Sequence, residues 1–559
     1  MLASCHPEVR VTASAGARGP VRARGAAPHS GRARPPGGYL ARGDRRAGGG
    51  SHPAATRRGI RASLRGPWHS RGAAPRGDGR RRGRGRVARG PGGRRARRDG
   101  RDDGPLGGAR PALAPRPVCR ASGASRPAPG RPRKRQHQER LTGSEHHPAV
   151  SSAVEASVRR FGETEPRLHA FVHFDAENSL LMDAALIATH ATGALVRVPV
   201  GVKDIFDTAG APAERGSALY AGRIAESDAE VVRNLRAAGA IIVGKTVTAE
   251  LAMAHPGPTR NPWDLSRTSG GSSMGSAAAV AAGVVPLAVG SQTNGSVIRP
   301  AAFCGVVGFK PSFGRLSREG MFVTSDTLDQ VGGFARSVHE AARLAAAMAG
   351  EPVGRWWSDD RTPPKLAALR TGEWEHADDA VQKRFQADVD RLAAAGYPIE
   401  WPAPPAGLDD AQRVLRTIML YEEARAMKRD LSGRETLVSE IVRSHLADGA
   451  AISDDLYRDA LRTRERLAKA FASWATPFDA ILTPATVGEA PTPETTGDPR
   501  FCTRWSLMGA PAIVVPSGLG PSRLPLGLQL VATPGDDRRL LAAAAWCEAT
   551  LPPIGAPPL

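Results

Sequence analysis

The sequence predicts an α/β fold in which a mixed central β-sheet is flanked by helices. Short β-branched segments alternate with helical periodicity between residues 196 and 350, which is the order typical of α/β proteins. Strand character returns late in the chain, after a long helical stretch. The 559-residue chain is also long enough to bury a large core.

The N-terminal quarter differs from the rest. Residues 1–140 contain 35 Lys and Arg against 7 Asp and Glu, whereas the remaining residues contain 42 against 48. The first part is rich in Arg, Gly and Pro and lacks a sustained apolar period, so it cannot bury enough surface to fold. We therefore predict a disordered, basic low-complexity segment over 1–142, and we favour translation of sequence upstream of the true start. A transit peptide and an RNA-binding tail are alternatives, although the aromatic residues that stack on bases are missing.

Order is expected over 143–559, and its first half alternates helices and strands. A capping box formed by Ser227 and Glu230 predicts a helix that ends at Gly239. The apolar residues after Val154 predict an amphipathic helix leading into a packed turn near Phe171. The other expected helices are 178–192, 277–283 and 337–350, and the expected strands are 196–204, 240–245, 284–290 and 305–311.

The second half begins with a predicted mainly helical cap or insertion over 350–478. Apolar, β-branched segments then predict strands at 479–484, 512–516 and 526–531. A helix over 538–551 closes the chain.

Composition also excludes several classes of protein. The five cysteines form no CxxC pair, which argues against a zinc site or a disulfide framework and favours a reducing compartment. No run of about 18 apolar residues is present, so no membrane span is expected. We therefore expect a cytoplasmic protein without metal or cofactor.

Two glycine-bracketed serines, Ser272 and Ser296, dominate the centre of the sequence. Glycine allows the backbone to approach a bound group closely, and successive N–H groups can stabilise an oxyanion. No histidine lies in this stretch, so the base that activates a serine has to be another residue. Lys203 and Lys245 each end a predicted strand. Val200 and Val202 precede Lys203 and favour its burial, which would lower the pKa of Lys203.

Six short motifs give the chain a family resemblance over about 150–550. The motifs are Gly201-Val202-Lys203-Asp204, Gly270-Gly271-Ser272-Ser273, Gly295-Ser296, Pro300-Ala301-Ala302-Phe303, Gly308-Phe309-Lys310-Pro311 and Trp505-Ser506-Leu507-Met508-Gly509-Ala510-Pro511. In the order and spacing of these motifs the chain resembles the amidase signature family. The resemblance implies the amidase signature fold and a Ser–Ser–Lys triad.

Residue by residue, the resemblance implies that Ser296 is the nucleophile, Ser272 the bridging serine and Lys203 the base. It also implies a cis peptide between Gly271 and Ser272. The oxyanion hole would consist of the backbone N–H groups of Thr293, Asn294, Gly295 and Ser296. The residues that would support the site or bind substrate are Gly271, Ser273, Gln292, Arg299 and Asp204.

The chain departs from the commonest family pattern near the nucleophile. Gln292 stands where an aspartate is usual, Asn294 where a glycine is usual, and Arg299 one place later than usual relative to Ser296. These departures put any ion pair of that arginine in doubt and count against the A-type component of an amidotransferase.

The other polar residues of these motifs have simpler explanations. We expect Lys245 to be a solvated strand-end lysine, Lys310 to be structural and Cys304 to be a small core residue. Asp204 either orients Lys203 or only ends its strand.

The predicted function is therefore an amide-bond hydrolase that releases ammonia or an amine from a small carboxamide. Within the family, the alternatives are an allophanate- or carbamate-type hydrolase and the A-type component of an amidotransferase. From another class, the alternative is an inactive or RNA-binding protein that uses the arginine-rich tail. The expected partner is the small amide alone; a homodimer is left open, and neither a nucleic acid nor a membrane is favoured.

Overall fold

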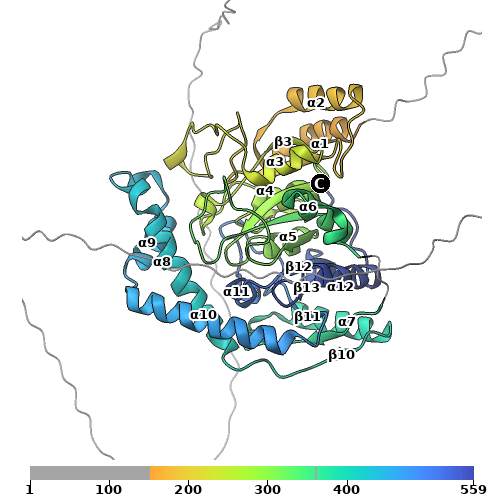
Figure 1. Ribbon diagram of the computed structural model, residues 1–559, viewed down its shortest axis with the longest axis vertical. Coiled ribbons are helices and arrows are strands. Elements are labelled where there is room, and N and C mark those ends of the chain that lie inside the picture. The colour runs from red at the N-terminus through yellow and green to blue at the C-terminus, as the bar shows by residue number, and fades with distance from the viewer. Residues whose placement is uncertain (1–151, 359–361) are drawn as a thin grey trace, which may run out of the picture. The chain divides into compact units, whose positions relative to one another are not determined.

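The computed structural model describes residues 152–358 and 362–559, so the basic segment predicted over 1–142 lies outside the described residues. In the described part, an eleven-stranded mixed sheet has the strand order β1–β3–β2–β6–β8–β7–β12–β13–β11–β9–β10 (Figure 1). The strands are β1 Phe171–Phe174, β2 Pro199–Lys203, β3 Ile241–Thr246, β6 Leu287–Gln292, β7 Val307–Lys310, β8 Gln330–Ala335, β9 Leu366–Ala368, β10 Ile399–Glu400, β11 Ala480–Pro484, β12 Ala512–Leu519 and β13 Pro525–Val531. The expected mixed α/β architecture is confirmed.

Parallel and antiparallel pairs form separate blocks of the sheet. Strand β2 is parallel to both β3 and β6, whereas β8, β7, β12, β13 and β11 pair antiparallel in succession. Parallel pairing returns at the far edge, where β11, β9 and β10 meet. A separate hairpin joins β4 (Arg260–Asn261) to β5 (Asp264–Thr268).

Helices cover both faces of the sheet. Alternate residues of a strand point to opposite faces, so Ile242 joins one core cluster and its neighbours Ile241 and Val243 join the other. The first cluster packs against α3 (Glu230–Ala237), α6 (Val338–Ala349), α7 (Asp379–Ala394) and α12 (Asp537–Thr550). The second packs against α1 (Ala153–Leu168), α4 (Met274–Ala281), α5 (Ile298–Cys304), α8 (Ala411–Leu431), α10 (Asp454–Ala475) and α11 (Arg500–Leu507).

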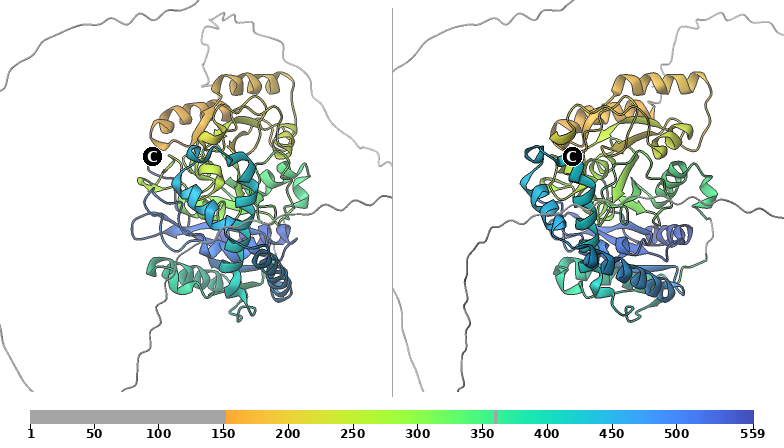
Figure 2. Two further views of the ribbon diagram at one scale, coloured as in Figure 1. Left: turned by 90° about the vertical axis from the view of Figure 1, so that its left-hand side faces the viewer. Right: turned by 60° about the vertical axis from the view of Figure 1, so that its left-hand side comes forward.

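In its described residues, the segment 350–478 contains four α-helices and two strands. It contains α7, α8, α9 (Glu440–Ala450) and α10, and it contributes β9 and β10 to the edge of the large sheet. The figures show α10 at the opposite end of the described structure from α1 and α2 (Ala176–Ala188), with α8 and α9 extending from it along one side (Figures 1 and 2). The segment therefore extends the sheet as well as supplying helices beside it.

Helix α4 explains the alanine run of the sequence. All its residues except Ala281 are buried, and small side chains let it lie close against the sheet. At Gly275 a Cβ atom would lie 2.0 Å from the carbonyl oxygen of Ala170, so even alanine is excluded there. The helix is thereby held in the position that its preceding loop requires.

Some local predictions were wrong. The packed turn near Phe171 is strand β1, which pairs with β3. The capping box does not form, because Ala229 occupies the N-cap of α3 and no side chain caps it. Gly239 does follow the helix with φ +84°, as predicted. Strand β8 and helices α5 and α11 were not predicted.

None of the helices within the described ranges is both long enough and apolar enough to cross a bilayer.

Candidate active site

The candidate site lies where the parallel strands β2, β3 and β6 end. In parallel strands the carboxyl ends meet at one edge of the sheet, where α/β proteins commonly bind ligands. Lys203 is the last residue of β2 and Gln292 the last of β6. Ser272 lies in the loop before α4, and Ser296 lies between β6 and α5. The topology therefore brings together segments that are far apart in the sequence.

Lys203 is completely buried and forms hydrogen bonds with two serines. Its Nζ lies 2.9 Å from Ser272 Oγ and 2.8 Å from Ser291 Oγ. Burial lowers the pKa of Lys203 to about 7, although the negative charge of Asp329 acts in the opposite direction. A large share of Lys203 is therefore uncharged near neutral pH and able to accept a proton.

Ser272 is fixed by its backbone as well as by Lys203. The predicted cis peptide between Gly271 and Ser272 is confirmed. The carbonyl oxygen of Gly271 accepts a hydrogen bond of 2.7 Å from Nη2 of Arg299, and a Cβ atom at Gly271 would lie 2.7 Å from Cγ2 of Thr496. Ser273 Oγ donates a hydrogen bond of 3.1 Å to the carbonyl oxygen of Ser291, which ties the loop to β6. Both neighbours of Ser272 are thus held in place.

Ser296 lies in the loop that joins β6 to α5, and only 8% of its surface is exposed. Its Oγ makes no hydrogen bond to any described residue, so the Lys203–Ser272 contact is present without a Ser272–Ser296 bond. The backbone N–H groups of Asn294, Gly295 and Ser296 also have no acceptor among the described residues. These groups are available to a ligand.

The side chain of Gln292 holds this loop by hydrogen bonds. Its Oε1 accepts hydrogen bonds from the N–H groups of Val297 (2.8 Å) and Ile298 (3.0 Å), which begin α5. Its Nε2 donates to Ser506 Oγ at 2.9 Å, and that hydroxyl donates to the carbonyl oxygen of Asn294. An amide can make this set of contacts because it both accepts and donates, whereas an ionised carboxylate only accepts.

Gln292→Met is expected to lower the free energy of unfolding by about 2–4 kcal/mol, because it leaves buried N–H groups and the Ser506 hydroxyl without partners. Urea denaturation followed by circular dichroism measures the change. Gln386→Met on α7 is the control, since Gln386 bonds only to the exposed Arg370 and Asp390 and the change should stay within about 0.5 kcal/mol. Equal effects in the two variants would contradict the assigned role.

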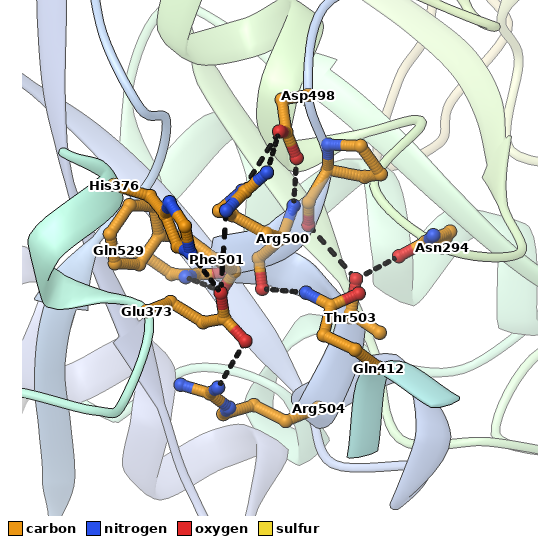
Figure 3. A network of polar contacts seen from close by, with 11 residues as sticks. Asn294, Glu373, His376, Gln412, Asp498, Arg500, Phe501, Thr503, Arg504 and Gln529 are labelled. Carbon is orange, nitrogen blue, oxygen red and sulfur yellow. Dashed lines mark hydrogen bonds and ion pairs between the residues drawn. The ribbon is translucent and has the colours of Figure 1, made fainter. Parts of the chain in front are cut away.

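Asn294 is anchored from the other side by α11. Thr503 Oγ1 donates to its Oδ1 at 2.7 Å, and the same helix begins with Arg500, which pairs with Asp498 (Figure 3). Glu373 lies close to both Arg500 and Arg504 in the same network. Asn294 is therefore bonded to a helix that takes part in a network of ion pairs.

Arg299 is buried, with 5% exposure, and forms no ion pair with a carboxylate in the described part of the chain. Burial lowers its pKa, while the nearby charge of Asp498 raises it. Besides Gly271, its Nη2 lies 3.3 Å from Thr496 Oγ1. The ion pair that the shifted sequence position put in doubt is thus absent among the described residues, and the guanidinium donates to the Gly271 carbonyl oxygen.

Two expectations about charged residues need correction. Lys245 is not solvated: it is completely buried, and its Nζ lies 3.0 Å from Asp204 Oδ1 and 2.6 Å from the carbonyl oxygen of Pro212. Asp204 consequently pairs with Lys245 and is not bonded to Lys203. The expected structural role of Lys310 fits its bond to Gln330, and Cys304 is buried as expected.

A cavity of about 240 Å³ opens beside Ser296. Its walls come from residues 293–299, from the segments 252–254 and 495–499, and from α8 and α9. The lining residues are Ala252, Met253, Ala254, Thr293, Asn294, Ser296, Arg299, Met419, Glu423, His445, Thr495, Thr496, Gly497 and Pro499. Larger cavities of about 420 and 780 Å³ lie elsewhere and contain none of the predicted site residues.

Several residues of the site were missed from the sequence. Ser291 contacts Lys203 because of the register of β6 beside β2. Asp329, which acts on the pKa of Lys203, lies in the unpredicted loop before β8. Glu423 and His445 lie on helices whose packing the sequence did not specify. Within the described ranges, no three His, Cys, Asp or Glu side chains are grouped so that they could hold a metal ion.

Comparison with known proteins identifies the family of the chain. The sequence model of the family described as Amidase matches residues 152–541. The A subunit of the glutamyl-tRNA(Gln) amidotransferase from Anaeromyxobacter dehalogenans (strain 2CP-C) is 37% identical over 467 residues, which cover 73% of this chain and 95% of that protein.

Solved structures give the same result. A crystal structure of an amidase is 30% identical with a TM-score of 0.66, covering 72% of this chain and 97% of its own. The structure of a 6-aminohexanoate cyclic dimer hydrolase is 26% identical with a TM-score of 0.65, covering 72% and 94%. The chain belongs to the amidase family.

Proposed function

We propose that the chain hydrolyses a small amide, with Ser296 as nucleophile, Ser272 as the bridging serine and Lys203 as the base. The observation that carries this proposal is the buried Lys203, whose pKa is about 7 and whose Nζ lies 2.9 Å from Ser272 Oγ. A lysine serves as a base only when its environment suppresses its charge, and complete burial does this.

The proposed reaction begins with two proton transfers. Neutral Lys203 accepts the proton of Ser272, which accepts the proton of Ser296, and Ser296 Oγ attacks the amide carbonyl carbon. Ser291 Oγ, 2.8 Å from Nζ, accepts one amine hydrogen and so helps turn the nitrogen lone pair toward Ser272. The Ser272–Ser296 bond is expected to form when substrate binds, because catalytic hydrogen bonds often tighten only in the complex.

The attack moves negative charge onto the carbonyl oxygen. The backbone N–H groups of Thr293 to Ser296 are proposed to stabilise it, supported by the absence of protein acceptors for the last three among the described residues. The relayed proton then passes to the leaving nitrogen, the C–N bond breaks, and an acyl-enzyme forms on Ser296. Water hydrolyses this ester by the same relay and regenerates the serine. No step requires a metal ion or a cofactor.

The size of the cavity supports a small substrate. About 240 Å³ lies below the 300–1,000 Å³ typical of sites for drug-sized ligands. Met253 and Met419 supply apolar surface to its walls.

A second candidate is the A-type component of an amidotransferase, favoured by the name of the 37% identical relative. Such a component would need partner proteins. The two candidates are separated by assaying this chain alone: ammonia release from simple amides without any partner favours the hydrolase, and activity that appears only with partner proteins favours the amidotransferase.

A fluorophosphonate probe tests the proposed nucleophile directly. Such a probe reacts with activated serines, so mass spectrometry should find the adduct on Ser296 and not on Ser272 or Ser273. Deleting residues 1–140 should leave labelling and hydrolysis unchanged, because the predicted chemistry lies entirely within the amidase domain. An unlabelled protein, or an adduct at another serine, would contradict the proposal.

A further inference from the structure

The wall of the cavity supplied by α8 and α9 carries a buried acid–base pair that the proposed reaction does not use. Met419 and Glu423 are four residues apart on α8, hence on one face of the helix, and both line the cavity. His445 on α9 lies beside them, and its Nε2 is 2.6 Å from Glu423 Oε2. The adjacent Glu422 turns elsewhere and binds the hydroxyls of Thr327 and Tyr457.

Glu423 has one oxygen without a partner. Its side chain is 4% exposed, and Oε1 forms no hydrogen bond to a described residue, since the only bond of this carboxyl is to His445 through Oε2. Oε1 is thus an acceptor without a described partner, on a residue that lines the cavity. A buried, half-satisfied carboxyl is costly unless a ligand completes its bonds.

Burial and charges of both signs act on the carboxyl of Glu423. Burial raises its pKa most, and the charges of Asp329 and Glu422 raise it further, whereas His445 lowers it. Arg299 lines the same cavity; its Nη2 donates to the carbonyl oxygen of Gly271, and its Nε has no hydrogen-bond partner among the described residues. A cationic hydrogen-bond donor next to Oε1 would supply the missing bond and would stabilise the ionised carboxyl that burial disfavours.

We propose that Glu423, held in place by His445, binds an ammonium group on the acyl part of the substrate, so that small aminoalkanamides are preferred over uncharged amides of the same length. This inference rests on the proposed function. The volume of about 240 Å³ limits the substrate to a short chain between the amide and the ammonium. The alternative is that the pair only joins α8 to α9, which would affect every substrate equally.

The test compares matched amides on the purified full chain. Ammonia release is measured for 3-aminopropanamide against butanamide, 4-aminobutanamide against pentanamide, and 5-aminopentanamide against hexanamide. For at least one pair, kcat/KM for the amino compound should be about 10- to 100-fold higher, as expected for a charge-assisted hydrogen bond. Glu423→Gln keeps the shape and an acceptor for His445, and it should remove this preference by raising KM for the amino compounds well above any change for the uncharged amides.

Glu465→Gln on the exposed side of α10 is the control and should preserve the preference. An unchanged preference in Glu423→Gln, or equal loss for both members of each pair, would overturn the inference while leaving the hydrolase intact. If no amide is hydrolysed, the proposed function fails, and calorimetry with 4-aminobutanamide still decides this inference. Binding to the full chain that is about tenfold weaker in Glu423→Gln supports it, and absent or equal binding refutes it.

Discussion

Ser296→Ala is expected to lower kcat by about 10⁴- to 10⁶-fold, the range seen when a serine nucleophile is removed from a catalytic unit. Residual turnover would come from binding and from the free N–H groups of the loop. Ammonia release from the best amide of the panel measures the loss. Activity within tenfold of wild type would reject Ser296 as the nucleophile.

The same substitution should leave the protein folded. Ser296 Oγ has no hydrogen-bond partner among the described residues, so its removal leaves no buried group unpaired, and the free energy of unfolding should change by less than about 0.5 kcal/mol. Ser273→Ala is the matched control, in which the free energy of unfolding is expected to fall. Ser273 bonds to the backbone of Ser291, and its loss should cost about 1–2 kcal/mol of stability. A large loss of stability in Ser296→Ala would mean that its inactivity reflects unfolding.

The sequence predicted the parts of this site that depend on local chemistry. Glycines next to serine, β-branched residues around a lysine and an alanine run each have a local physical meaning, and Lys203, Ser272 and α4 were located from them. The family resemblance added the cis peptide before Ser272, which neither composition nor periodicity indicates.

What the sequence did not predict depends on register and packing. Lys245 was expected to be solvated because it stands at the end of a predicted strand; its partner, Asp204, is 41 residues away and follows the adjacent strand. Ser291 reaches Lys203 only because β6 lies parallel to β2. Glu423 and His445 meet only because α8 packs against α9. Each of these contacts joins segments whose relative position is set by the whole fold.

Lys203→Met is expected to reduce kcat/KM by at least about 10³-fold, because general-base catalysis alone contributes 10²–10⁴-fold and the serine relay fails without it. In the wild type, the neutral amine is the active form, so kcat/KM should rise with pH through about 7 and then level off. Lys203→Arg keeps a positive charge but cannot lose its proton, and it should be equally inactive. Substantial activity in Lys203→Arg would exclude the proton-transfer role.

The same residue should make the wild type less stable than it could be. The pKa of Lys203 falls from 10.5 to about 7 on folding, so between these values the unfolded chain binds more protons and stability increases with pH. At pH 7 this protonation preference costs on the order of 5 kcal/mol, and Lys203→Met removes it at the expense of bonds to Ser272 and Ser291. The stability of the variant relative to the wild type should therefore decrease steadily between pH 7 and 10, as followed by urea denaturation. A constant difference across that range would show that Lys203 is charged in the folded protein, and a charged Lys203 could not accept the proton of Ser272.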